Sequence, residues 1–338
     1  MNPFAPKGTR SDAKLSRKLY DKAILLKPTR DGYGSGIVQA AETNDRIVVL
    51  CADLTESTRN AAFKERFPDR FVQIGVQEQL LAATAAGFAL AGKIPFINSY
   101  AIFCPGRAWE QVRTNICLND VNVKIVGNHA GVSVGPDGST HQALEDMAIM
   151  RVIPRMTVIA PCDAIEAQKA TLAAAMMKGP CYIRYAREAT PVFTTDKTPF
   201  RIGKAETFRD GTDVAVIACG PLVHTALLAA EELRKEERLD VMVINCHTVK
   251  PLDAKTVAKA AETCGAIVTV EEHQIAGGLG GAVAECLASK RPTPMEFIGI
   301  HDRFGESGTP KELIERFGMD VAAIKKAIRD AVARKSST

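Results

Sequence analysis

The sequence predicts an α/β protein of two domains: a larger one with a mainly parallel β-sheet, then a smaller α/β domain. Short apolar segments alternate with longer helical patterns along most of the 338 residues. Such alternation is typical of a parallel sheet that helices cover on both faces. Prolines, threonines and a glycine interrupt it at residues 186–211 and indicate a connection between two units. The length also suits two domains of roughly 150 residues each.

The breaks in the pattern give the expected boundaries. They are an N-terminal arm at 1–28, a first domain at 29–190, a linker at 191–211 and a second domain at 212–338. The arm is polar and mildly basic, with one short helical stretch at 11–26. We expect it to be solvated or to contact another subunit.

Each domain has its own set of predicted elements. In the first domain we expect strands at 47–51, 71–74, 94–98, 123–128, 156–160 and 181–185. Its helices are expected at 29–41, 77–91, 107–118, 141–150 and 163–178. In the second domain the strands are expected at 213–218, 240–245, 266–271 and 296–300. Its helices are expected at 221–235, 253–262, 279–289, 310–317 and 320–334.

Composition excludes several classes of protein. A hydrophobic content of 46% with 24% charged residues describes a soluble globular protein, and a net charge of +4 implies no nucleic-acid partner. No apolar run approaches the roughly 18 residues of a membrane span, and the N-terminus lacks the apolar core of a signal peptide. The nine cysteines include no Cys-x-x-Cys pair, which predicts buried free thiols in a reducing cytoplasm.

Glu78 is the first candidate for a chemical role. It follows an apolar strand and Gly75, and it stands at the start of a helix rich in small residues. Backbone N–H groups and the helix dipole favour a carboxylate at this position. Small residues predict tight packing, so we expect the turn to be buried, and a buried carboxylate needs a partner or becomes protonated. The alternative is that Glu78 only occupies the first turn of a core helix.

Polar and aromatic residues follow several other predicted strands. They are Asp53, Ser57, Tyr100, Phe103, His129, Asp137, His141 and Arg187. Because parallel strands end at one edge of a sheet, we expect these side chains to form one site. Arg30 and Arg187, with Ser57 and His129, indicate an anion site there. The alternative is core packing for the two aromatic residues and surface exposure for the arginines.

Two glycine-rich segments allow other interpretations. The loop 127–142 could hold zinc through His129, Asp137, His141 and Glu145, although this spacing fits no compact zinc pattern; His141 could also cap the following helix. The segment 277–281 could bind a dinucleotide, although it does not match Gly-x-Gly-x-x-Gly and no acidic residue follows at the required distance.

Several motifs together resemble the transketolase family. Ile-Gly-Val-Gln-Glu-Gln at 74–79 is similar to its Ile-x-Glu-Gln/His signature, and His129, Asp137 and His141 match its spacing of histidines and aspartate. Glu-Glu-His-Gln at 271–274 and the glycines after it resemble the C-terminal domain of transketolases and E1β subunits. The resemblance runs from Thr29 to the C-terminal helix, which corresponds to the second half of an ordinary transketolase. It implies a thiamine-diphosphate-binding pyrimidine fold followed by a transketolase C-terminal domain.

The resemblance also implies roles for the candidate residues. Glu78 would bind N1′ of the thiamine diphosphate pyrimidine ring, and Glu78, Asp137 and His141 would be catalytic. The remaining cofactor-binding residues would be Tyr100, Phe103 and Asp53. The sugar substrate would be bound by Arg30, Ser57, His129, Asp137, His141 and Arg187. Its anionic end would lie with the arginines, opposite Asp137 and His141.

One family motif is missing. Transketolases bind the diphosphate and Mg²⁺ through Gly-Asp-Gly and a later asparagine, and this sequence has no Gly-Asp-Gly. The resemblance therefore implies the C-terminal subunit of a split transketolase, with no metal ligands of its own. The partner would be an N-terminal transketolase subunit that holds Mg²⁺ and the diphosphate, in an A2B2 heterotetramer containing a dimer of this chain.

The implied reaction is transfer of a two-carbon ketol unit from a ketose phosphate to an aldose phosphate. Phosphorylated pentoses are the expected substrates, but branched or sulfonated sugars fit the same residues. Two alternatives stay open: an E1β subunit of a 2-oxo acid dehydrogenase, and a non-catalytic interaction subunit of the same fold. The segment 134–142 favours a sugar over a 2-oxo acid, because sugar hydroxyls need Asp137 and His141.

Overall fold

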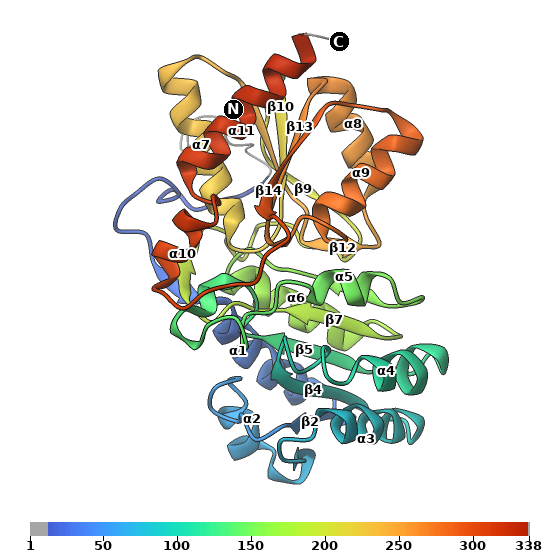
Figure 1. The fold of residues 1–338 in the computed structure, drawn as a ribbon. Coiled ribbons are helices and arrows are strands. Elements are labelled where there is room, and N and C mark those ends of the chain that lie inside the picture. The colour runs from blue at the N-terminus through green and yellow to red at the C-terminus, as the bar shows by residue number, and fades with distance from the viewer. Residues whose placement is uncertain (1–12, 337–338) are drawn as a thin grey trace.

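The computed structural model describes residues 13–336 and has two stacked α/β domains (Figure 1). The first is built on a seven-stranded sheet with the order β12-β6-β7-β5-β4-β2-β3. Its strands are β2 (Ile47–Cys51), β3 (Phe71–Gln73), β4 (Ile94–Tyr100), β5 (Lys124–Asn128), β6 (Thr157–Ile159), β7 (Cys181–Arg184) and β12 (Thr248–Lys250). All neighbours are parallel except β12, which runs antiparallel to β6. The predicted mainly parallel α/β fold is confirmed.

The helices of the first domain cover both faces of this sheet. They are α1 (Thr29–Thr43), α2 (Ala61–Arg66), α3 (Glu78–Leu90), α4 (Trp109–Gln111), α5 (Asp146–Arg151) and α6 (Ala164–Met176), with shorter or irregular turns η1 (Pro68–Arg70), η2 (Val112–Leu118) and η3 (Val132–Asp137). Small residues let α1 and α6 approach closely: a Cβ added at Gly32 would lie 2.0 Å from the carbonyl oxygen of Ala164. The small-residue character of these segments therefore sets the helix spacing.

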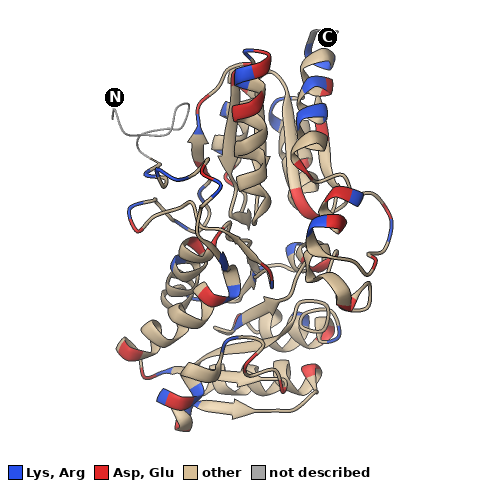
Figure 2. Cartoon of the chain, turned by 90° about the vertical axis from the view of Figure 1, so that its left-hand side faces the viewer, with Lys and Arg blue, Asp and Glu red and all other residues tan. Residues whose placement is uncertain are grey.

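The second domain is built on a five-stranded sheet with the order β14-β13-β10-β11-β9. Its strands are β9 (Glu206–Arg209), β10 (Val214–Ala218), β11 (Val241–Asn245), β13 (Ile267–Gln274) and β14 (Met295–Ile300). Its helices are α7 (Leu222–Glu236), α8 (Ala254–Cys264), α9 (Leu279–Lys290), α10 (Pro310–Arg316) and α11 (Val321–Ser336). Only β9 is antiparallel to its neighbour. Acidic and basic residues are interspersed along both domains (Figure 2).

The N-terminal arm differs from the expectation. The predicted helix at 11–26 is wrong for the described residues 13–25, which form turns, and residues 11 and 12 lie outside the described range. Leu15 and Leu19 are buried in the core of the second domain, so this part of the arm is not solvated. The reason is that burying these side chains in the core is worth more free energy than an isolated short helix gains from its own hydrogen bonds. The arm ends in β1 (Leu26–Pro28), which pairs antiparallel with β8 (Ala189–Pro191).

Two further predictions are corrected, and one strand had no prediction. The stretch 191–211, predicted as a linker, contains β9, which pairs with β11 in the second sheet. The helix predicted at 141–150 begins only at Asp146, because the backbone before it forms a bridge between Ala130 and Ala143. The strand β12 was not predicted; its three residues join the sheet of the other domain, so no local pattern marks them.

Buried charged groups join the two domains. The Arg184 side chain is 6% exposed; its Nε donates to Asp146 Oδ2 at 2.9 Å, and its Nη2 donates to the carbonyl oxygen of Glu272 at 2.7 Å. Tyr182 Oη also donates to Asp146, at 2.6 Å. A buried charge without a partner costs on the order of several kcal/mol of stability. Arg184 therefore ties α5 and β13 to the first sheet.

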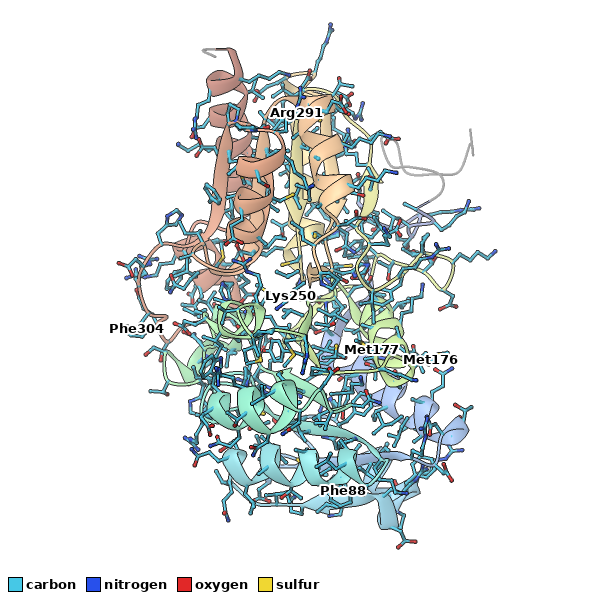
Figure 3. The ribbon with its side chains drawn as sticks, turned by 90° about the vertical axis from the view of Figure 1, so that its right-hand side faces the viewer. Phe88, Met176, Met177, Lys250, Arg291 and Phe304 are labelled. Atoms are coloured by element: carbon cyan, nitrogen blue, oxygen red, sulfur yellow. The ribbon has the colours of Figure 1, made fainter. Side chains whose placement is uncertain are left out.

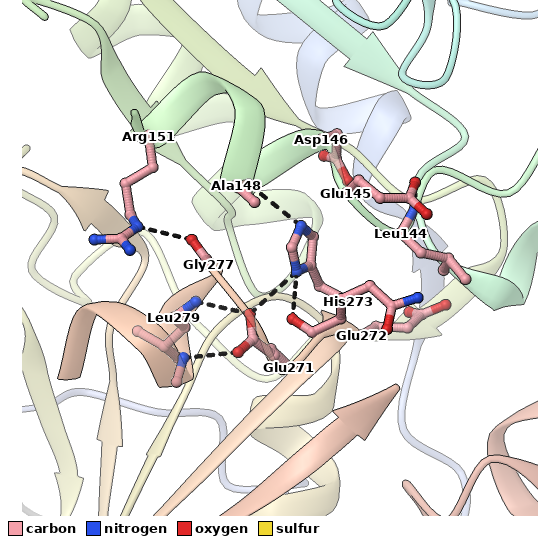
Figure 4. A network of polar contacts seen from close by, with 12 residues as sticks. Leu144, Glu145, Asp146, Ala148, Arg151, Glu271, Glu272, His273, Gly277 and Leu279 are labelled. Carbon is pink, nitrogen blue, oxygen red and sulfur yellow. Dashed lines mark hydrogen bonds and ion pairs between the residues drawn. The ribbon is translucent and has the colours of Figure 1, made fainter. Parts of the chain in front are cut away.

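A neutral histidine makes a further contact between the domains (Figure 4). His273 Nε2 accepts the Ala148 N–H at 3.3 Å, and Nδ1 lies 2.6 Å from the carbonyl oxygen of Gln274, to which it donates. Burial lowers the pKa of His273, which agrees with a neutral ring bearing its hydrogen on Nδ1. Lys250, which lies where the domains meet (Figure 3), donates to the carbonyl oxygen of Arg151 at 2.8 Å. The domain interface is therefore specified by hydrogen bonds as well as by apolar packing.

The stability contribution of Arg184 can be measured directly. Arg184→Met should lower the free energy of unfolding by about 3–5 kcal/mol, because it leaves the buried Asp146 carboxylate without its cation. The matched control is Arg66→Met, which removes a half-exposed ion pair with Glu42 and should cost less than about 1 kcal/mol. Urea denaturation of both variants tests the difference, and equal effects would contradict the proposed importance of the buried pair.

Candidate active site

Glu78 lies at the strand-to-helix turn that the sequence predicts. Gly75 adopts a φ of +86°, which turns the chain from β3 into α3, and Glu78 is the first residue of that helix. Its side chain is 1% exposed. Ser99 Oγ donates to Oε1 at 3.1 Å, and Arg107 Nη1 donates to Oε2 at 3.0 Å. The predicted burial of Glu78 is confirmed, and both oxygens have partners.

Two aromatic residues lie beside Arg107, the cation that pairs with Glu78. Tyr100 ends β4, and Phe103 lies in the turn that follows, with 6.3 Å between the two ring centroids. The Arg107 guanidinium lies 4.9 Å from the centroid of the Phe103 ring, so Arg107 contacts both this ring and Glu78. The His141 ring stands edge-on to both aromatic rings, at 5.3 Å from Phe103 and 6.2 Å from Tyr100. The structure therefore brings four predicted site residues together.

His129 occupies the centre of the predicted anion site. Its ring stacks on Tyr100 at 4.0 Å, and its Nε2 lies 3.1 Å from Arg30 Nη1 and 3.4 Å from Ser57 Oγ. Burial, with the positive charges of Arg30 and Arg187, lowers the pKa of His129 to about 3. The ring is therefore neutral; Nε2 accepts from Arg30, and Nδ1 has no partner within the described residues. With Nε2 accepting, the ring hydrogen is on this buried nitrogen.

Arg187 and Asp137 are neighbours, and not at opposite ends of the site as expected. Arg187 Nη1 lies 3.2 Å from Asp137 Oδ2 and donates to the carbonyl oxygen of Val134 at 2.9 Å. The cause is the path of the loop after β5, in which Gly131 and Gly135 adopt positive φ values and return the chain toward the end of β7. Asp137 thus neutralises the cation that was predicted to bind the substrate.

Asp53 does not join this cluster. It is exposed, with a φ of +60°, and its backbone N–H donates to Gln73 Oε1 at 2.8 Å. Among the described residues its carboxylate makes no hydrogen bond or ion pair with the other predicted site residues. A contact between Asp53 and a cofactor stays a prediction from the resemblance.

The structure disfavours the alternatives for the two glycine-rich segments. Over residues 13–336, no group of three or more His, Cys, Asp or Glu side chains could hold a metal ion. His141 does not cap a helix, since its Nδ1 lies 2.9 Å from Thr140 Oγ1 and α5 begins later. At the start of α9, Glu271 accepts the N–H groups of Leu279 and Gly280, each at 2.7 Å. The chain's own carboxylate thus occupies the position that a dinucleotide phosphate would need.

Two residues of the cluster were missed from the sequence. Ser99 stands one position before Tyr100 at the end of β4, so its place at a strand end was a usable signal. Arg107 had no such signal, because it follows the strand by a turn of several residues.

No helix within residues 13–336 combines the length and apolar character needed to cross a membrane.

Comparison with known families matches both domains. The model for the transketolase pyrimidine binding domain matches residues 27–192, and the model for the transketolase C-terminal domain matches residues 203–324. The gap between the two matches, residues 193–202, lies within the predicted linker at 191–211. The order of the two domains is the one that the sequence motifs indicate.

Individual relatives agree with these matches. A Methanocaldococcus jannaschii protein, provisionally named a transketolase C-terminal section, is 42% identical over 92% of this chain and 98% of its own length. The 6-deoxy-6-sulfo-D-fructose transketolase subunit SqwH of Clostridium sp. (strain MSTE9) is 39% identical over 91% of this chain and 95% of its own. A solved structure described as a split gene transketolase, inactive beta4 tetramer, has a TM-score of 0.86, with 40% identity over 91% of this chain and 99% of that one. The chain therefore belongs to the transketolase family, in which it corresponds to the C-terminal part of split members.

Proposed function

We propose that this chain is the C-terminal subunit of a thiamine-diphosphate-dependent split transketolase, which transfers a two-carbon ketol unit from a ketose to an aldose. The observation that carries the proposal is the buried Glu78 carboxylate, linked through Arg107 to the Phe103 ring, with Tyr100, His141 and the anion site adjoining. No observation on the described residues favours an E1β subunit or a non-catalytic subunit.

The residues present fit the pyrimidine ring of the cofactor. A flat heteroaromatic ring with a basic nitrogen needs an apolar face and one carboxylate, which the half-buried Tyr100 and Phe103 rings and Glu78 supply. When bound, thiamine diphosphate supplies carbanion chemistry at the substrate carbonyl. Glu78 would hold a proton at N1′, and its burial would strengthen that interaction by excluding water.

The substrate would lie between His141 and the arginines. His141 and Asp137 would orient sugar hydroxyls and move protons, while Arg187, Arg30 and His129 would bind the anionic end. In the present structure Asp137 already pairs with Arg187. A phosphate or sulfonate group would therefore compete with this carboxylate for the guanidinium, while Asp137 becomes available to a hydroxyl group.

A second subunit completes the proposed enzyme. We propose that an N-terminal transketolase subunit supplies the Mg²⁺ and diphosphate ligands in an A2B2 assembly. Support comes from the related split-gene structure, which is described as an inactive β4 tetramer.

We further propose a cytoplasmic location, supported by nine free cysteines, eight of them buried. The 6-deoxy-6-sulfo-D-fructose relative adds sulfonated sugars to the phosphorylated ones as substrates to test.

Dependence on the partner gives the first test of function. The purified chain alone should show no ketol transfer and weak thiamine diphosphate binding, because this proposal assigns the diphosphate and Mg²⁺ ligands to the other subunit. Calorimetric titration of the cofactor into the chain, with and without the partner and Mg²⁺, measures this. Tight Mg²⁺-dependent binding by the chain alone would refute the division of the site.

Replacement of the buried carboxylate tests the role of Glu78. Glu78→Gln should preserve the fold and reduce turnover by about 10²–10⁴-fold, because glutamine can form a hydrogen bond to N1′ but cannot share a proton with it. The rate of cofactor C2–H exchange in the assembled complex, followed by NMR, is the direct measurement. Exchange as fast as in the wild-type complex would exclude Glu78 from this role.

Arg187→Ala tests the anion site. The variant should raise KM for phosphorylated sugars by about ten- to a hundredfold, the value of one charge-assisted hydrogen bond, and leave KM for the uncharged acceptor glycolaldehyde nearly unchanged. The matched control is Arg66→Ala, which removes an exposed arginine on α2. Equal changes for both acceptors, or for neither, would show that Arg187 does not bind the anionic group.

A further inference from the structure

Arg107 makes an unequal ion pair with Glu78. The pair joins a carboxylate whose side chain is 1% exposed to a guanidinium whose side chain is 51% exposed. Arg107 Nη1 donates to Oε2 at 3.0 Å, while Ser99 Oγ, which is buried, donates to Oε1. One partner is thus fixed in the interior, and the other reaches it from the solvent side.

The surroundings of Arg107 allow it to leave. It lies in the turns between β4 and α4, after Pro105 and Gly106, and its guanidinium rests on the half-buried Phe103 ring. A half-exposed arginine regains water when it moves away, whereas Glu78 is held by α3 and Ser99 and cannot follow. Arg107 is therefore the member of the ion pair that has room to move.

Glu78 needs this partner only while no other group binds it. A buried carboxylate without a counter-charge is costly, so the chain needs a cation there before a ligand arrives. A ring nitrogen that shares a proton with Glu78 would remove the need for this counter-charge. A guanidinium that remained on the same carboxylate would stabilise the anion and oppose the sharing of the proton.

We propose that Arg107 is a displaceable counter-ion of Glu78. It neutralises the carboxylate before the cofactor binds, and it leaves Oε2 when the pyrimidine nitrogen engages Glu78. This inference rests on the proposed function, to which it adds a positioning residue. Arg107 holds the carboxylate in place and lowers cofactor affinity by the free energy of the ion pair that must be broken.

Cofactor affinity tests the displacement. Arg107→Gln in the complex with the partner subunit should lower Kd for thiamine diphosphate, measured by calorimetry with Mg²⁺, by about three- to thirtyfold, since no ion pair is then broken on binding. Arg107→Lys keeps the charge and should return Kd toward the wild-type value. The control Arg113→Gln removes an exposed arginine of η2 and should leave Kd unchanged. An unchanged or higher Kd for Arg107→Gln would overturn the proposal.

A double-mutant cycle in the isolated chain tests the ion pair without any cofactor. Arg107→Gln should destabilise the wild-type chain in urea denaturation and have little effect in the Glu78→Gln background, because the charge that it neutralises is then gone. Absence of coupling would overturn the counter-ion assignment. If the coupling is present but the wild-type complex binds no thiamine diphosphate, the proposed function and the displacement fail while the ion pair stands, so the two failures are distinguishable.

Discussion

The cost of taking a charge out of water is the constraint on which this structure depends most. Arg184 is almost fully buried between the domains, where Asp146 and the carbonyl oxygen of Glu272 are within hydrogen-bonding distance. These three groups come from different elements, so the charge is compensated only when β7, α5 and β13 are all in place. Apolar packing alone would tolerate small shifts between the domains, whereas this arrangement requires one relative position.

The same constraint shapes the candidate active site. Glu78 and His129 are both buried, and each is accommodated differently: Glu78 by a charged partner and His129 by remaining neutral. The neutral histidine accepts from Arg30, which leaves that cation available at the mouth of the site. Asp137 likewise compensates Arg187. Two pairs of opposite charges at the site, Glu78 with Arg107 and Asp137 with Arg187, thus compensate each other.

Much of the site was predictable because strand ends are visible in a sequence. Tyr100, His129 and Arg187 follow strands at the positions where their patterns stop, and the parallel order of β4, β5 and β7 brings those ends to one edge. The glycines of the loop after β5 indicated a flexible choice of backbone conformation, but they did not indicate the path that the loop takes. Asp137 was therefore expected away from Arg187. Arg107 was missed because it follows its strand by a turn with no periodic pattern.

The sequence by itself determined the alternation of strands and helices, the position of Glu78 at a helix start, and the membership in the transketolase family that the motifs indicated. These features depend on residues that are close in the chain. Only the tertiary structure decided that Leu19 packs into the second domain, that β12 joins the sheet of the first domain, and which cation pairs with each buried carboxylate. Such contacts join distant segments, and a segment's own pattern does not encode the surface that it will meet.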